Sequence, residues 1–173
     1  MTFLTDSTLL KKDQAVAQTP SKSGQDAESS LQEQHENSLD TLVAKFYEVL
    51  SFRQNPKQDW ETFFECLTPE ARLINNNGTS PILMSISNFI AIYRSQALQR
   101  DFQPFIVAEK DHKTEIFGKI AHRYSYYTIA YPNSSLPKTY GRASLQCILV
   151  DKKWRVVSFV WNDYTDESGE NFG

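Results

Sequence analysis

The sequence predicts an α+β fold in which three N-terminal helices pack on a strongly curved, mainly antiparallel sheet. Apolar residues recur at helical spacing between residues 38 and 97, and the chain after them is rich in β-branched and aromatic residues. The longest such run, 114–131, contains no proline, and two further runs follow at 140–150 and 154–161. Strands of this length twist, so we expect helices on the concave side to enclose a cone with an internal cavity.

The composition fits one globular domain with an aromatic-rich core, since 40% of the 173 residues are hydrophobic and 13% aromatic. A net charge of −3 without a basic stripe argues against nucleic acid as a partner. No run approaches the roughly 18 apolar residues that span a membrane, and the N-terminus lacks the features of a signal peptide. Cys66 and Cys147 are expected to be buried thiols, so the sequence favours a cytoplasmic location.

The domain is expected to occupy residues 37–165, between a disordered tail at 1–36 and a flexible end at 166–173. The tail is polar and acidic, and such a segment buries too little apolar surface to offset its ordering entropy. Its stretch 27–35 also fits an N-terminal extension of the helix that follows. That helix is predicted from Ser38, as N-cap, to Phe52.

The first helix has an apolar stripe at helical spacing, formed by Leu39, Leu42, Val43, Phe46, Tyr47, Val49 and Leu50. A second helix is expected after Asp59 as N-cap, followed by a short turn at 68–70, a strand at 71–75 and a loop at 76–81. Ser85 or Ser87 caps the third helix, whose apolar face contains Ile86, Phe89, Ile90, Tyr93 and Ala97.

Four antiparallel strands are expected after the third helix. The first, 102–109, pairs through a turn at 111–113 with the long strand 114–131, and the others are 140–150 and 154–161. Both faces of the last strand are largely apolar, and a sheet that is apolar on both faces needs a second cover. We therefore expect a homodimer formed through the sheet face.

Three segments resemble the nuclear-transport-factor-2-like superfamily, which includes ketosteroid isomerases, scytalone dehydratase and SnoaL-like polyketide cyclases. They are Phe46–Leu50, the segment Leu67–Asn75 with the following Gly78, and Trp154–Val156 with Trp161 and Asn162. The resemblance covers residues 38–164 and implies a cone-shaped α+β domain. Because this fold occurs in enzymes, ligand carriers and interaction modules, it leaves the function open.

The resemblance also bears on chemistry. Tyr47 stands where ketosteroid isomerases have a tyrosine that binds the substrate oxyanion, and Asn75 stands where they have their carboxylate base. An amide cannot accept the proton. The region that holds their second oxyanion donor, an aspartic acid, corresponds to 141–150, which contains no acid. Ketosteroid-isomerase chemistry is therefore not expected.

His122 is the strongest catalytic candidate because it would share a strand face with Tyr124 and Tyr126. Periodicity leaves open which face of this strand turns inward. We expect the cavity to bind a small apolar or aromatic molecule without a cofactor or metal. The predicted ligand-binding residues are Tyr47, Trp60, Asn75, Tyr93, His122, Tyr124 and Tyr126.

Two alternatives stay open for the function. In the first, His122 and Tyr47 catalyse a cofactor-independent isomerisation, cyclisation or dehydration inside the cavity. In the second, the chain is a non-catalytic interaction or dimerisation module whose cone is filled by Trp60, Phe89 and Tyr93.

Overall fold

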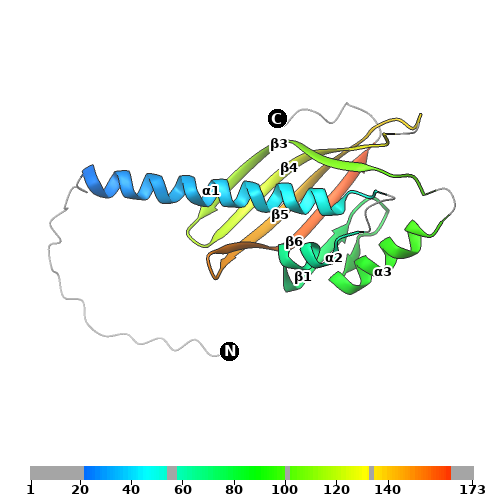
Figure 1. Cartoon of the computed structure of the whole chain (residues 1–173), viewed down its shortest axis with the longest axis horizontal. Coiled ribbons are helices and arrows are strands. Elements are labelled where there is room, and N and C mark those ends of the chain that lie inside the picture. The colour runs from blue at the N-terminus through cyan, green and yellow to red at the C-terminus, as the bar shows by residue number, and fades with distance from the viewer. Residues whose placement is uncertain (1–21, 54–57, 100–101, 133–134, 165–173) are drawn as a thin grey trace. The chain divides into compact units, whose positions relative to one another are not determined.

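The computed structural model describes residues 22–53, 58–99, 102–132 and 135–164. The chain divides into two units, and the whole sheet lies in the second, Gln34–Gly173. In chain order the elements (Figure 1) are α1 (Lys22–Leu50), α2 (Trp60–Cys66), β1 (Leu67–Asn75), β2 (Ile82–Met84), α3 (Ile86–Ala97), β3 (Ile106–Phe117), β4 (Ile120–Ala130), β5 (Thr139–Val150) and β6 (Lys153–Tyr164). None of the helices in these ranges combines the length and the apolar character that crossing a membrane requires.

Helix α1 begins at Lys22, well before the predicted N-cap. Ser38 lies inside the helix, where its hydroxyl donates to the carbonyl of His35 at 3.0 Å. The expectation that residues up to 36 form a disordered tail is therefore wrong from Lys22 onwards, and the helical extension over 27–35 is confirmed. Residues 1–21 and the predicted C-terminal end at 166–173 lie outside the described residues.

The strands form one curved, mixed sheet in the order β2-β1-β6-β5-β4-β3 (Figure 1). All neighbours pair antiparallel except β1 and β6, which are parallel. The predicted α+β class and the mainly antiparallel sheet are thus confirmed.

The predicted turn at 68–70 is wrong, because β1 already begins at Leu67. Its register with β6 shifts between Leu67 and Arg72, an irregularity that accommodates Pro69 within a strand. The short strand β2 was not predicted.

The predicted long strand 114–131 is folded into a hairpin. Its turn lies at Gly118, whose φ of 57° is a left-handed conformation that suits glycine. The predicted turn at 111–113 instead belongs to β3, directly after a register shift between Glu109 and Asp111. The other hairpin turn is where the sequence places it: Asp151 and Lys152, with φ of 49° and 62°, join β5 to β6.

The N-caps of the two shorter helices follow the sequence. The Asp59 carboxylate accepts from the backbone N–H of Thr62 at 2.9 Å, at the start of α2. The Ser85 hydroxyl accepts from the backbone N–H of Asn88 at 3.2 Å, which settles the choice between Ser85 and Ser87 for α3.

The core lies between α1 and the inner face of the sheet, where Val43 and Phe46 pack with Leu145 and Phe159. The pairing of β6 with β5 shifts register between Gln146 and Cys147 of β5. This shift interrupts the alternation of inward and outward side chains along β6. As a result, four large side chains of β6 share the inner face, namely Trp154, Val156, Phe159 and Trp161. Cys66 and Cys147 are free and buried, as predicted.

Candidate functional site

The face of β4 that turns toward the helices carries the odd-numbered residues. Ala121, Arg123, Ser125 and Tyr127 are buried, whereas Tyr124 on the other face is exposed. Two polar contacts from α1 fix this orientation. The Tyr47 hydroxyl donates to Ser125 Oγ at 2.7 Å, and Arg123 Nη1 donates to Asp40 Oδ1 at 2.5 Å. Because side chains alternate along a strand, the even-numbered residues point away from α1.

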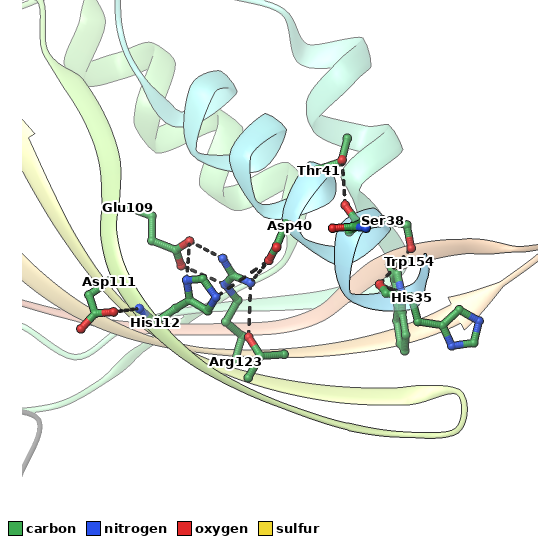
Figure 2. Close-up of polar contacts among 11 residues, drawn as sticks. His35, Ser38, Asp40, Thr41, Glu109, Asp111, His112, Arg123 and Trp154 are labelled. Carbon is green, nitrogen blue, oxygen red and sulfur yellow. Dashed lines mark hydrogen bonds and ion pairs between the residues drawn. The ribbon is translucent and has the colours of Figure 1, made fainter. Parts of the chain in front are cut away.

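A buried ionic cluster joins α1 to β3 and β4 (Figure 2). The Arg123 side chain, 3% exposed, donates to both carboxylate oxygens of Glu109 and to Thr114 Oγ1 at 3.2 Å. Burial by itself lowers the pKa of Arg123, but the hydrogen bonds to Glu109 and Asp40 outweigh it and raise that pKa. All three guanidinium nitrogens are thus hydrogen-bonded, and the cluster fastens the helix to the sheet.

A separate pocket of about 220 Å³ lies between α1, α3 and the inner face of the sheet. Its wall is mostly apolar and aromatic, and consists of Leu50, Phe89, Tyr93, Phe105, Val107, Ile129, Phe159 and Trp161. The polar groups that line it are Tyr47, Asn75, Gln96, Tyr127 and Asp163. An apolar wall with a few polar groups is the usual composition of a small-molecule site.

Tyr127, Gly141 and Asp163 lie in register across β4, β5 and β6. Tyr127 and Asp163 line the pocket, and this pair is called its polar end. Gly141 has no side chain, so the Tyr127 ring lies over it and reaches across β5. The Tyr127 hydroxyl donates to Asp163 Oδ1 at 2.5 Å. Burial, and then the charge of Asp163, raise the pKa of Tyr127, so its phenol stays protonated and Asp163 is the acceptor.

Asn77 holds the other side of the carboxylate. Its Nδ2 donates to Asp163 Oδ2 at 2.6 Å, and its Oδ1 accepts from the backbone N–H of Asp163 at 2.6 Å. Asn75 in turn accepts from the backbone N–H of Asn77 at 2.9 Å, which is a typical turn contact. The carboxylate is therefore fixed from both β4 and the loop after β1.

Three of the predicted ligand-binding residues, Tyr47, Asn75 and Tyr93, line this pocket together. The Tyr47 phenol is held protonated, because burial raises its pKa. Burial likewise raises the pKa of Tyr93, whose hydroxyl lies 3.4 Å from the Leu50 carbonyl oxygen. Trp60 does not line the pocket, but its ring packs edge-on against Tyr93 at 5.1 Å between ring centroids.

The other three predicted residues, His122, Tyr124 and Tyr126, lie on the opposite face of β4. His122 Nε2 is 2.8 Å from Ser144 Oγ, and its ring lies 4.2 Å from the Tyr124 ring. Tyr126 stacks on Tyr140 at 6.3 Å. The expectation that His122 and Tyr47 share one cavity is therefore not met, because Tyr47 contacts Ser125 on the inner face of β4, whereas His122 lies on the other face.

Sequence reasoning did not select Tyr127 or Asp163, which form the polar end of the pocket. A signal for Asp163 was present, because it follows Phe159 and Trp161 at strand spacing and shares their face. No comparable signal existed for Tyr127, since it could be chosen only once the inward face of β4 was known.

No family model matches the sequence, and no curated protein matches it. Solved structures do resemble it. An NTF-2-like protein of unknown function from Silicibacter pomeroyi is 16% identical with a TM-score of 0.56, over 77% of this chain and 98% of that one. An NTF2-like protein of unknown function from Pseudomonas putida is 10% identical with a TM-score of 0.61, over 80% and 93% of the two chains.

A third similar structure comes from Novosphingobium aromaticivorans and is described as a candidate aromatic ring hydroxylase. It is 10% identical with a TM-score of 0.55, over 72% of this chain and 85% of that one. At such identities the likeness concerns the fold alone. Together with the helix order and the sheet topology, these matches show that the chain has the nuclear-transport-factor-2-like fold.

Proposed function

We propose that this domain binds a small apolar or aromatic molecule in the pocket between α1, α3 and the sheet. The supporting observation is the pocket itself, where mostly apolar and aromatic side chains and a few polar groups line about 220 Å³. An engineered cavity of about 150 Å³ accepts benzene, whereas sites for drug-sized ligands begin at about 300 Å³. The ligand is therefore expected to contain one or two rings.

The aromatic wall suits such a ligand for a physical reason. Phe159 and Trp161 stack with 5.0 Å between ring centroids, and Phe89 meets Trp161 edge-on at 6.3 Å. A planar guest gains both burial and ring contacts from such an arrangement. The description of the Novosphingobium structure as a candidate aromatic ring hydroxylase is compatible with an aromatic ligand, as an analogy at the level of the fold.

The two alternatives from the sequence fit less well. Catalysis by His122 with Tyr47 requires both in one cavity, and they lie on opposite sides of the sheet. The filled-cone alternative is met in part, because Trp60 packs on Tyr93 and Phe89 lies 6.1 Å from Tyr93. Phe89 and Tyr93 nonetheless also line the remaining pocket, so the packing of these rings leaves room for a ligand.

Titration with indole, followed by isothermal calorimetry, tests the proposal. The wild-type chain is expected to bind indole, and Ile129→Trp, which fills the pocket from β4, is expected to abolish binding. Ile92→Trp is the matched control, because Ile92 is exposed on α3 and outside the pocket lining. Failure of indole and other one- and two-ring aromatics to bind the wild-type chain would reject the proposal.

We also propose that a second copy of the chain covers the outer face of the sheet. Phe117, Ile120 and Tyr124 are exposed there, at the β3–β4 end. Phe117 and Ile120 also line a groove of about 460 Å³ at this end of the sheet, together with Ile148 and Val157. A contiguous exposed apolar patch on a folded protein often marks a surface that binds another protein.

A further inference from the structure

Asp163 carries the only formal charge among the described residues that line the pocket. Its neighbours there are apolar side chains, phenols and amides. In the described ranges, none of the ion pairs between side chains includes Asp163. The pocket is thus a mostly apolar space with one negative charge at its edge.

The hydrogen bonds of Asp163 come from neutral donors. Tyr127 donates to Oδ1 at 2.5 Å and Asn77 donates to Oδ2 at 2.6 Å. An ionised carboxylate has about four acceptor positions, so these two bonds leave capacity for a further donor. They orient the carboxylate without neutralising its charge.

The aromatic wall, like the carboxylate, favours a ligand that carries a positive charge. Phe159, Trp161 and Phe89 present rings, and cations are attracted to aromatic faces, most strongly to that of tryptophan. An anionic ligand would face Asp163 without any cation among the described lining residues, which is unfavourable. A neutral ligand would leave the charge of Asp163 without a counter-ion inside the pocket.

We infer that the ligand is a small arylalkyl amine, whose protonated nitrogen pairs with Asp163 while its ring lies against Phe159 and Trp161. This inference rests on the proposed function, because it specifies the ligand class of the same pocket. It requires no covalent step: the amine enters protonated and forms a charge-assisted hydrogen bond to the carboxylate.

Three probes with one ring and a different end group test the inference, namely phenethylamine, 2-phenylethanol and 3-phenylpropionate. Calorimetry on the wild-type chain at neutral pH is expected to show phenethylamine binding about tenfold more tightly than 2-phenylethanol, with 3-phenylpropionate the weakest. The advantage of the amine over the alcohol is expected to shrink as salt is added, because it derives from charge.

Asp163→Asn removes the charge and keeps the shape, so it is expected to lose the preference for the amine over the alcohol. Asp151→Asn is the matched control: it removes an exposed carboxylate in the β5–β6 turn, outside the pocket lining, and the preference for the amine should persist. If Asp163→Asn does not fold, the wild-type comparison and its salt dependence decide the question.

The outcomes separate the two claims. Equal affinity of the wild-type chain for phenethylamine and 2-phenylethanol would overturn the amine inference and leave the aromatic-ligand proposal intact. Absence of binding by all three probes, and by indole, would remove both. A preference for the amine that survives Asp163→Asn would place the charge recognition at another residue and so also overturn the inference.

Discussion

A single methyl group at position 141 would disturb the polar end of the pocket. A Cβ atom built on Gly141 would lie 2.1 Å from Cζ and 2.4 Å from the hydroxyl oxygen of Tyr127, far closer than such atoms approach. The Tyr127 ring would have to move, although its hydroxyl is bound to Asp163. Glycine is therefore needed at this position because a ring from the neighbouring strand occupies the space of a side chain.

Gly141→Ala is expected to lower the free energy of unfolding by about 1–3 kcal/mol, as overpacking does, and to weaken binding of aromatic probes in the pocket. Urea unfolding measures the first effect. Gly78→Ala is the matched control, because a Cβ there would meet its nearest neighbour at 3.6 Å, an ordinary contact. Equal stability of the two variants would show that the Tyr127 ring adjusts without cost.

At the scale of elements, α1 is fastened to the sheet by charge as well as by apolar packing. The Arg123 and Glu109 side chains are 3% and 15% exposed, whereas Asp40 on α1 is 52% exposed. Removing one partner of a buried ion pair leaves an uncompensated charge, which costs far more than losing an exposed partner. Substituting Arg123 is therefore expected to destabilise the protein more than substituting Asp40.

Arg123→Met is expected to lower the free energy of unfolding by about 3–5 kcal/mol, because the mostly buried Glu109 carboxylate then loses the Arg123 guanidinium. Asp40→Asn is expected to cost at most about 1 kcal/mol, since Asp40 is half exposed. Urea unfolding at neutral pH compares the two. The double variant Arg123→Met with Glu109→Gln should recover part of the loss, and no recovery would contradict the ionic explanation.

A turn and a helix start were placed wrongly from the sequence. The polar run at 111–113 has typical turn composition but lies in β3, because Gly118 supplies the left-handed backbone on which the hairpin turns. Ser38 has the composition of an N-cap, yet the helix continues through it to Lys22. In both cases a residue composition typical of a turn or an N-cap lies inside a strand or helix that continues on either side of it.

At the scale of the whole molecule, the sheet has one face covered by helices and one face for which a partner is proposed. Sedimentation velocity is expected to show a dimer, and Ile120→Lys with Tyr124→Lys is expected to weaken it at least tenfold by placing charge in an apolar contact. Leu98→Lys is the control, because Leu98 is exposed at the end of α3. A wild-type chain that sediments as a monomer at high concentration would reject the proposal.

The sequence alone determined the α+β class, the caps at Asp59 and Ser85, and the strands near the C-terminus, because spacing and capping are local properties. It also selected Tyr47, Asn75 and Tyr93, which line one pocket. Only the tertiary structure decided which face of β4 turns inward, since both faces are chemically mixed and contacts from α1 fix the choice. For the same reason, the pairing of Tyr127 with Asp163 across Gly141 became visible only once three strands lay in register.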